Sequence, residues 1–441
     1  MATEPPLQQI EQAVLTAPQD ARAAFAWSGH LLERRAPLKS LVWSRRARCI
    51  AADAAPPWNR EALALWHLNR LGAAETAARR SAVLDPGYSP AWINLGAVLK
   101  RLAAYSRALR AYRRAEVAGA EPRAIGMNRA AIVLGGGNFR EGWPLYRNRH
   151  GALGAEPAAV WPELGEWDGR AMPGRLRILA EQGIGDAIMF LTLMHAVRQS
   201  VGAITLLVAP RLATLMRRSF PYADVVAPDE KGQLPSLAPA DAWICAGDLP
   251  AALGLFVDGD LRPHPYLQPD RRLSERLRAG IQRRSPDCRL VGIAWTSQAE
   301  DGWRRTVPPE LWRPLIETSG VRLVSLQYGA SPGDLAAFGD GIDCEHGVEP
   351  LTDIDGFAAL VAAMDMVVSP PNNTVHFAGA LDVPCLVLLP EDPDWRWGRS
   401  GATSLWYDRT RVYRKSARVD WPDLIRQIAA ELIGTPSEHR S

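Results

Sequence analysis

The sequence predicts an α + α/β fold, in which an array of helical repeats precedes two domains that alternate strands and helices. Small and aromatic residues recur at a spacing of 34 in the first third of the chain. From residue 175 onward, strand-length apolar runs alternate with helix-length amphipathic stretches. The length of 441 residues also exceeds what one core ordinarily organises, so several domains are expected.

The repeat is clearest in residues 91–115, AWINLGAVLKRLAAYSRALRAYRRA, which match the W-x2-L-G and A-x3-F/Y-x2-A spacing of a tetratricopeptide repeat (TPR). A step of 34 residues back from Trp92 reaches Trp58, and other copies are weaker. Small residues let paired helices approach, and each pair must stack on a neighbour to bury its apolar face. We therefore expect a TPR α-solenoid over residues 1–155, with an irregular helical bundle as the alternative. Such a solenoid ordinarily holds a partner in its groove.

The later strands are predicted from apolar runs of strand length. They are RLRILA (175–180), AITLLVA (203–209), LVGIAW (290–295), VRLVSLQ (321–327), DMVVS (365–369) and PCLVLLP (384–390). The alternation with helices indicates two parallel sheets with crossover helices. A polar, proline-flanked segment at 262–289 separates them as a helical linker. We place one α/β domain at 165–275 and a second at 285–435, with a cleft between them.

Five motifs carry a resemblance to a known family. They are EQGIGDAIMF (181–190), GIAWTS (292–297), VSLQYG (324–329), HFAGAL (376–381) and PDWRW (393–397). The chain resembles bacterial TPR-linked GT-B glycosyltransferases of the heptosyltransferase-like superfamily, with an architecture similar to TPR-containing protein O-glycosyltransferases. The resemblance implies a GT-B pair of Rossmann-like domains that face each other, with a nucleotide-sugar held mainly by the second.

The first motif forms a strand-to-helix corner. Gly183 and Gly185 give the chain room to turn and let a substrate approach the backbone, next to Gln182. Asp186 begins the following helix. The resemblance implies that Asp186 is the general base that deprotonates the acceptor hydroxyl, whereas its position alone is equally consistent with a helix cap.

The segment 369–381, SPPNNTVHFAGAL, follows a strand and opens a helix, so its amides are placed to bind phosphate. Asn372, Asn373 and Thr374 add side-chain donors, and His376 either contacts phosphate or packs in the core. Relatives in the family generally have Asp-Thr where this chain has Pro371 and Asn372, which puts the donor, and the activity itself, in question.

Two further loops supply donor-binding candidates. Thr296 and Ser297 end one strand, and Arg304 and Arg305 precede a proline-started helix. A metal-independent transferase needs a cation to neutralise the leaving phosphate, a task that arginine performs with bidentate geometry. The alternative for the two arginines is a solvated surface pair.

The remaining candidates lie at the ends of later strands. Gln327 and Tyr328 are placed to contact a base or sugar, or else are structural. Asp394, Trp395 and Arg396 form an amphipathic group that either stacks on a base and closes the cleft or seals the domain edge. We expect no metal site, because no DxD-type motif stands in the expected place, and no cofactor beyond the nucleotide-sugar substrate.

Bulk properties narrow the classes of partner. A formal net charge of +3 does not indicate nucleic acid or an anionic membrane. The five cysteines are scattered, which fits a reducing cytoplasm. The first residues, MATEPPLQQIEQAV, lack the apolar core of a secretory signal, and no apolar run is long enough to span a bilayer.

Together these features predict an inverting, metal-independent glycosyltransferase whose TPR domain recruits a protein acceptor. The resemblance makes flagellin, modified with a nonulosonic acid such as pseudaminic acid, the preferred specific acceptor. Two alternatives stay open: transfer to a cell-envelope saccharide, and a non-catalytic TPR scaffold with a degenerate GT-B domain.

Overall fold

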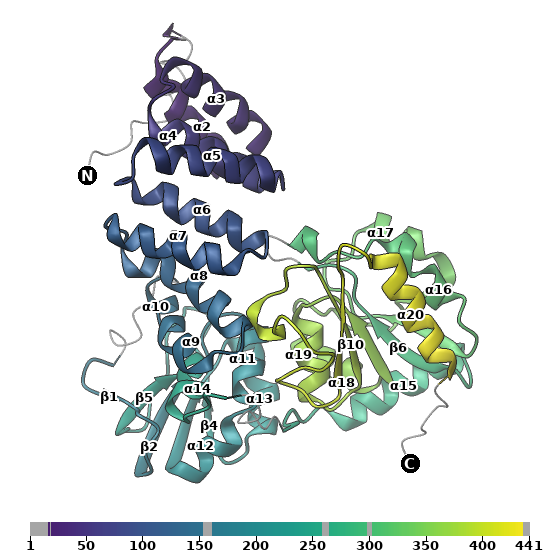
Figure 1. Ribbon diagram of the computed structural model, residues 1–441. Coiled ribbons are helices and arrows are strands. Elements are labelled where there is room, and N and C mark those ends of the chain that lie inside the picture. The colour runs from purple at the N-terminus through teal and green to yellow at the C-terminus, as the bar shows by residue number, and fades with distance from the viewer. Residues whose placement is uncertain (1–15, 18, 153–160, 258–263, 298–301, 435–441) are drawn as a thin grey trace. The chain divides into compact units, whose positions relative to one another are not determined.

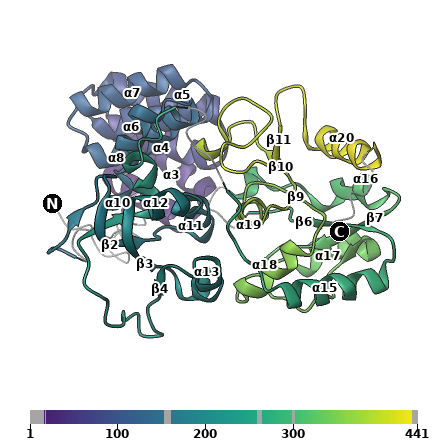
Figure 2. The ribbon, with the colours of Figure 1, turned by 90° about the horizontal axis from the view of Figure 1, so that it is seen from below.

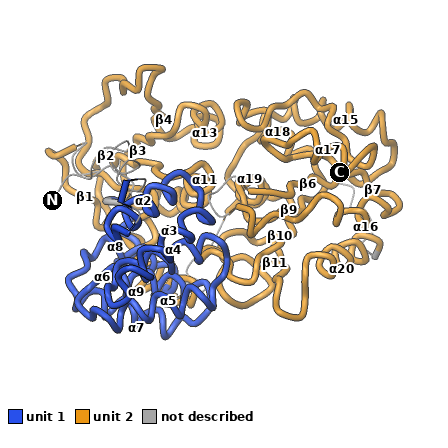
Figure 3. The backbone as a smooth tube through the Cα atoms, turned by 90° about the horizontal axis from the view of Figure 1, so that it is seen from above, with its two compact units in different colours: residues 1–133, 144–154 blue, residues 134–143, 155–441 orange. Residues whose placement is uncertain are grey.

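The computed structural model describes residues 16–17, 19–152, 161–257, 264–297 and 302–434. The expectation about a secretory signal concerns the first residues, and residues 1–15 lie outside the described ones. The chain divides into two compact units (Figure 3): unit 1 is residues 1–133 and 144–154, and unit 2 is residues 134–143 and 155–441. Unit 1 is helical and unit 2 holds two parallel sheets, so the predicted α + α/β class is confirmed.

The helices of the first part of the chain follow one another as antiparallel pairs (Figure 1). They are α2 (Ala21–Glu33), α3 (Pro37–Ile50), α4 (Ala55–His67), α5 (Leu71–Leu84), α6 (Ser89–Arg101), α7 (Tyr105–Val117), α8 (Pro122–Gly135), α9 (Phe139–Tyr146) and α10 (Arg149–Ala152). Helices α8 and α9 contribute residues to both units.

Close packing between the paired helices explains the small residues of the repeat. A Cβ atom at Gly96 of α6 would lie 2.5 Å from the ring of Tyr112 in α7, so only glycine fits there. Ala62, Ala78 and Ala108 are fully buried in the same core. The predicted helical repeat is therefore confirmed, because the residues that define its spacing are those that allow helices to approach.

The first sheet of unit 2 has five parallel strands in the order β1-β5-β2-β3-β4. Its strands are β1 (Gly165–Glu166), β2 (Met172–Leu179), β3 (Val201–Leu207), β4 (Asp224–Val226) and β5 (Ala242–Cys245). The helices that follow them are α11 (Ile184–Leu191), α12 (Met194–Ser200), η2 (Pro210–Leu212), α13 (Ala213–Ser219), η3 (Ala246–Asp248) and α14 (Leu249–Ala252).

The second sheet has six parallel strands in the order β11-β10-β9-β6-β7-β8. Its strands are β6 (Arg289–Ile293), β7 (Val321–Ser325), β8 (Ile342–Asp343), β9 (Met366–Ser369), β10 (Cys385–Leu389) and β11 (Thr410–Arg414). The associated helices are α15 (Arg271–Arg284), η4 (Gly302–Arg304), η5 (Pro309–Trp312), α16 (Arg313–Ile316), α17 (Pro332–Phe338), η6 (Gly339–Gly341), α18 (Ile354–Ala362), α19 (Asn373–Ala380), η7 (Trp395–Trp397) and α20 (Trp421–Gly434).

All six apolar runs predicted as strands form strands, and α15 lies in the predicted helical linker. Five of the described strands were not predicted. Three of them, β1, β4 and β8, have two or three residues, which leave no periodic pattern, while β5 and β11 have four and five residues. Helix α11 and helix α19 pack against each other, which brings the helix after β2 of the first sheet against the helix after β9 of the second (Figure 2). None of the described helices combines the length and apolar character needed to cross a membrane.

Candidate active site where two sheets meet

The corner between β2 and α11 turns through Gln182, whose φ of 72° lies in the left-handed region. Gly183 is the N-cap of α11 and has an extended backbone, so the turn does not depend on the conformational freedom of a glycine. On the neighbouring strand, β5 leads into η3, and the amide of Gly247 donates to Glu181 Oε1 at 3.3 Å. The corner is thus fixed from the side of β5.

Gly185 is needed for packing between the two helices. A Cβ atom at this position would lie 2.7 Å from Cδ2 of His376 and 2.8 Å from Oδ1 of Asn373, both on α19. The sequence led us to expect that this glycine lets a substrate approach the backbone. In the structure, the space beside Gly185 is filled by α19. Gly183, by contrast, has no atom nearer to its Cβ position than Asp186 Oδ2, at 3.8 Å.

Asp186 is paired with Arg396, so the first and second sheets each contribute one member of an ion pair. The Nε atom of Arg396 donates to Asp186 Oδ1 at 2.8 Å, and its Nη2 atom donates to the same oxygen. Asp186 does not cap α11, because the N-cap is Gly183 and the carboxylate is directed to the guanidinium. Among the described residues, Asp186 Oδ2 receives no hydrogen bond.

The PDWRW motif forms η7 and orients Arg396. Asp394 is the N-cap of η7, and it accepts hydrogen bonds from the backbone amide of Arg396 at 3.1 Å and from its Nη1 atom at 2.6 Å. Burial acts to raise the pKa of Asp394, but the charge and hydrogen bonds of Arg396 bring that pKa below its ordinary value. The guanidinium carbon also lies 4.7 Å from the centre of the Trp395 ring.

Trp395 is held in an aromatic cluster that includes Trp143, which belongs to the helical residues 134–143 of unit 2. Its ring centre lies 5.6 Å from that of Trp143, 6.4 Å from Phe190 and 6.3 Å from Trp406. Trp143 is fully buried, and its Nε1 donates to the carbonyl of Leu255 at 2.8 Å. This packing supports the domain-edge role that the sequence left open for the tryptophans.

Asn372 caps α19 and ties it to the loop after β6. Its Oδ1 accepts from the amide of Thr374 at 2.9 Å, and its Nδ2 donates to the carbonyl of Thr296 at 3.0 Å. Thr374 is fully buried and its hydroxyl makes no hydrogen bond among the described residues, whereas Asn373 is half-buried. The departure at Pro371-Asn372 therefore retains a capped helix at the position expected to bind phosphate.

His376 lies one turn into α19, against Gly185. Its Nδ1 is 2.9 Å from the hydroxyl of Tyr407, and its ring is nearly inaccessible. Burial lowers the pKa of His376 to about 4, with Asp186 opposing that shift. The imidazole is therefore neutral at physiological pH. His376 therefore packs in the core, and it also lies close enough to Asp186 for the carboxylate to affect its pKa.

The loop after β6 is braced by Gln327. Its Oε1 accepts from the amides of Trp295 and Thr296, each at 2.9 Å, and its Nε2 donates to the carbonyl of Tyr328 at 2.8 Å. The amide group expected to contact a base or sugar is thus engaged in holding two strand ends together. Ser297 is buried, and Tyr328 is half-buried.

Arg304 and Arg305 are half-buried and are not a solvated surface pair. Arg304 forms an ion pair with Asp392 at 3.5 Å, and Arg305 Nη1 donates to the carbonyl of Pro371 at 3.3 Å. The second of these contacts places a cation beside the N-terminus of α19. Asp392 was not predicted, although it precedes the PDWRW motif by one residue.

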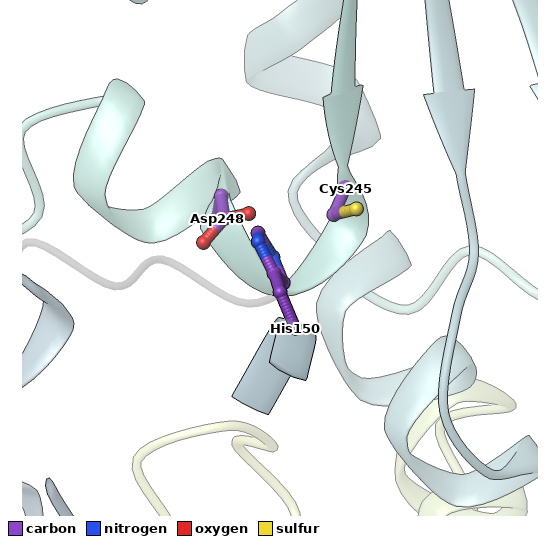
Figure 4. Close-up of side chains that lie close together, drawn as sticks. All are labelled: His150, Cys245 and Asp248. Carbon is purple, nitrogen blue, oxygen red and sulfur yellow. The ribbon is translucent and has the colours of Figure 1, made fainter. Parts of the chain in front are cut away.

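The structure thus gathers Asp186, Asn373, His376, Asp394 and Arg396 around the contact between α11 and α19. Thr296, Arg305, Asn372 and Gln327 form a connected group at the end of β6 and β9. Tyr407 and Trp143 were missed: both support site residues, but neither stands in a motif whose spacing indicates chemistry. Figure 4 shows two more buried side chains near the corner, Cys245 at the end of β5 and Asp248 at the end of η3.

Comparison with known proteins finds a similar sequence and similar folds. No family model matches the chain. Protein FlbA of Caulobacter vibrioides is 28% identical and is matched over 95% of this chain and 74% of its own length.

Among solved structures, the chain is similar to a glycosyl transferase family 9 protein from Veillonella parvula, with 12% identity, a TM-score of 0.41, and coverage of 60% of this chain and 99% of that one. It is similar to the ADP-heptose lps heptosyltransferase II of E. coli at 15% identity, with a TM-score of 0.39 and coverage of 59% and 99%. An O-GlcNAc transferase mutant of Thermobaculum terrenum is 16% identical, with a TM-score of 0.35 and coverage of 94% and 91%. The chain itself has helical repeats followed by two parallel α/β sheets, which is the order of elements that its motifs predict.

Proposed function

We propose that the chain is an inverting, metal-independent glycosyltransferase that moves a sugar from a nucleotide-sugar to a protein acceptor. One observation carries the proposal: Asp186 projects from the first sheet's corner to Arg396 of the second sheet, beside the N-terminus of α19. Ligands of parallel α/β sheets bind beyond the carboxyl ends of the strands, which is where these residues stand.

Asp186 acts as the general base in this proposal. Both hydrogen bonds from Arg396 go to Oδ1, so Oδ2 is left to accept the proton of an acceptor hydroxyl. A Cβ atom at position 183 would lie 3.8 Å from Oδ2, so the glycine there adds no side chain beside the carboxylate. As the acceptor oxygen bonds to the anomeric carbon, the carbon–phosphate oxygen bond breaks and the proton passes to the carboxylate.

The leaving nucleoside phosphate is stabilised from the other side. The N-terminus of α19 carries a partial positive charge, Asn373 offers an amide, and Arg305 lies beside Pro371. Arg304 adds a second guanidinium next to the same loop. These arginines supply the positive charge that a metal ion would otherwise supply to the leaving phosphate, so the proposed transfer needs no metal. It also needs no cofactor, because the nucleotide-sugar is a substrate.

We propose a cytoplasmic location, and a protein acceptor recruited by the helical repeats. Flagellin carrying a nonulosonic acid is the specific acceptor and product that we favour. The test mixes the purified full chain with flagellin and each of CMP-, ADP- and UDP-linked sugars, and measures the intact mass of flagellin. A mass increase with one donor supports the proposal. If a donor binds in a titration but no sugar is transferred to flagellin, flagellin is not the acceptor.

The same assay separates the two alternatives. For a cell-envelope saccharide transferase, donor binds and a saccharide acceptor gains mass while flagellin does not. For a scaffold, no donor binds. Pro371 and Asn372 favour this alternative, because they replace the Asp-Thr of the family resembled.

A further inference from the structure

An arginine pair recurs three times in the helical repeats at a spacing of 34 residues. The pairs stand in the second helix of successive helix pairs, α3, α5 and α7, and all six side chains are exposed. They are Arg45 and Arg46, Arg79 and Arg80, and Arg113 and Arg114. A spacing equal to the repeat length puts each pair at the same position on its helix.

The three helices form one layer of unit 1. The first helices contact one another in sequence, α2 with α4 and α4 with α6, so α3, α5 and α7 lie on the other side of the array. An ion pair between Arg107 of α7 and Glu75 of α5 confirms that these outer surfaces are adjacent. The arginine pairs therefore form a ladder on one face of unit 1, which we call the arginine face.

The three helices that carry this face have a larger net positive charge than the whole chain. Helices α3, α5 and α7 carry ten basic residues and two glutamates, against a formal net charge of +3 for all 441 residues. Both glutamates are already paired: Glu75 with Arg79 and Arg107, and Glu116 with Arg129. The buried Glu61 of α4 in turn pairs with Arg45 and Arg48 of α3, which leaves the three helices with a large positive excess. Whole-chain charge thus conceals a local positive surface.

Aliphatic side chains are also exposed on the same three helices. Val42, Val83 and Val117 are 65%, 69% and 83% exposed, and Val83 and Val117 occupy equivalent positions of their repeats. The exposed residues of the three helices include no aromatic side chain and no Asn or Gln. Protein interfaces combine arginine with aromatic anchors, and single-stranded nucleic acid is bound by aromatic stacking, so this face lacks the exposed aromatic side chains that both use.

We propose that the arginine face binds a surface of anionic phospholipid. Such a surface offers a dense field of phosphates without directional recognition, and its interface accepts exposed aliphatic side chains. Arginine forms bidentate hydrogen bonds with phosphate, and repetition over three helices spreads these contacts across a plane. The proposal concerns unit 1 and does not depend on glycosyl transfer by unit 2.

The experiment is co-sedimentation of the full chain with vesicles. One set is an equal mixture of phosphatidylcholine and phosphatidylglycerol, and the other is phosphatidylcholine alone. The test variant replaces Arg79, Arg80, Arg113 and Arg114 with Gln, which retains helix propensity. The control replaces four exposed arginines of α15 in unit 2 with Gln, so that net charge changes equally: Arg271, Arg272, Arg276 and Arg283.

The chain is expected to sediment with the anionic vesicles only, and to be released as salt is raised. The test variant should lose at least about tenfold in partitioning, while the α15 control retains it and both keep the wild-type circular dichroism. Equal loss in the two variants, equal binding to neutral vesicles, or no binding to either would overturn the proposal. If double-stranded DNA binds the chain at a phosphate concentration at which the anionic vesicles do not, the face would be assigned to nucleic acid instead.

Discussion

Replacement of Gly185 by Ala tests the packing that brings the two sheets together. The added Cβ atom would stand 2.7 Å from His376 and 2.8 Å from Asn373. His376 is buried and bonded to Tyr407, so it has little freedom to move away. Overpacking of this kind costs about 1–3 kcal/mol, and the higher helix propensity of Ala returns up to about 1 kcal/mol.

The expected net effect is a loss of about 1–2 kcal/mol in the free energy of unfolding of unit 2. Gly72→Ala is a matched control, because Gly72 is also the second residue of its helix and has no atom within 4 Å of its Cβ position. Urea titration followed by far-UV circular dichroism measures both variants. Gly72→Ala should stabilise by about 0.5–1 kcal/mol. If Gly185→Ala is as stable as Gly72→Ala, α11 and α19 are not packed as described.

Two other substitutions address the supports of the site. Trp143→Ala should destabilise unit 2 by about 3–5 kcal/mol, because it empties a buried volume and leaves the carbonyl of Leu255 unpaired. Trp143→Phe should retain part of that stability. If urea unfolding shows both variants to be as stable as the wild type, Trp143 is not part of the core. For His376, burial lowers the pKa from 6.5 to about 4, against the influence of nearby Asp186 and with Arg396 and Asp394 as the other charged neighbours. Its neutral form is the one that folding favours, so the stability it contributes is complete above about pH 6.5 and is lost as pH falls towards 4, by up to about 3 kcal/mol. His376→Gln should flatten stability against pH in that window, and an unaltered slope in urea titrations would show that the imidazole is not buried in its neutral form.

The sequence alone was sufficient for the repeat and for six of the described strands, because the repeat has a fixed period and those strands are apolar runs bounded by polar segments. Gly96 is predictable because every TPR helix pair needs a small residue where a large one approaches, and Tyr112 is that neighbour. Edge strands such as β8 were missed because they are two residues long, and their place is set by pairing with β7.

Within the site, the motifs identified the residues but not all of their contacts. Asp186 and Arg396 are 210 positions apart, and no local pattern indicates that they meet. Gly185 was interpreted as a substrate-facing glycine, but the neighbour that requires it, His376, comes from the other sheet. Gln327 was expected to contact ligand, and its amide instead satisfies two backbone N–H groups that a sequence does not reveal as unpaired.

The most direct test of the account is the rate of sugar transfer by Asp186→Asn, measured with the donor and acceptor found by the mass assay. Asparagine preserves shape but cannot accept the proton, so kcat should fall by about 10²–10⁴ while the Kd of the donor stays within a few-fold of wild type. Asp340→Asn, at an exposed position of η6, should transfer at the wild-type rate. Transfer by Asp186→Asn at the rate of the Asp340→Asn control would contradict the central claim that this carboxylate is the base.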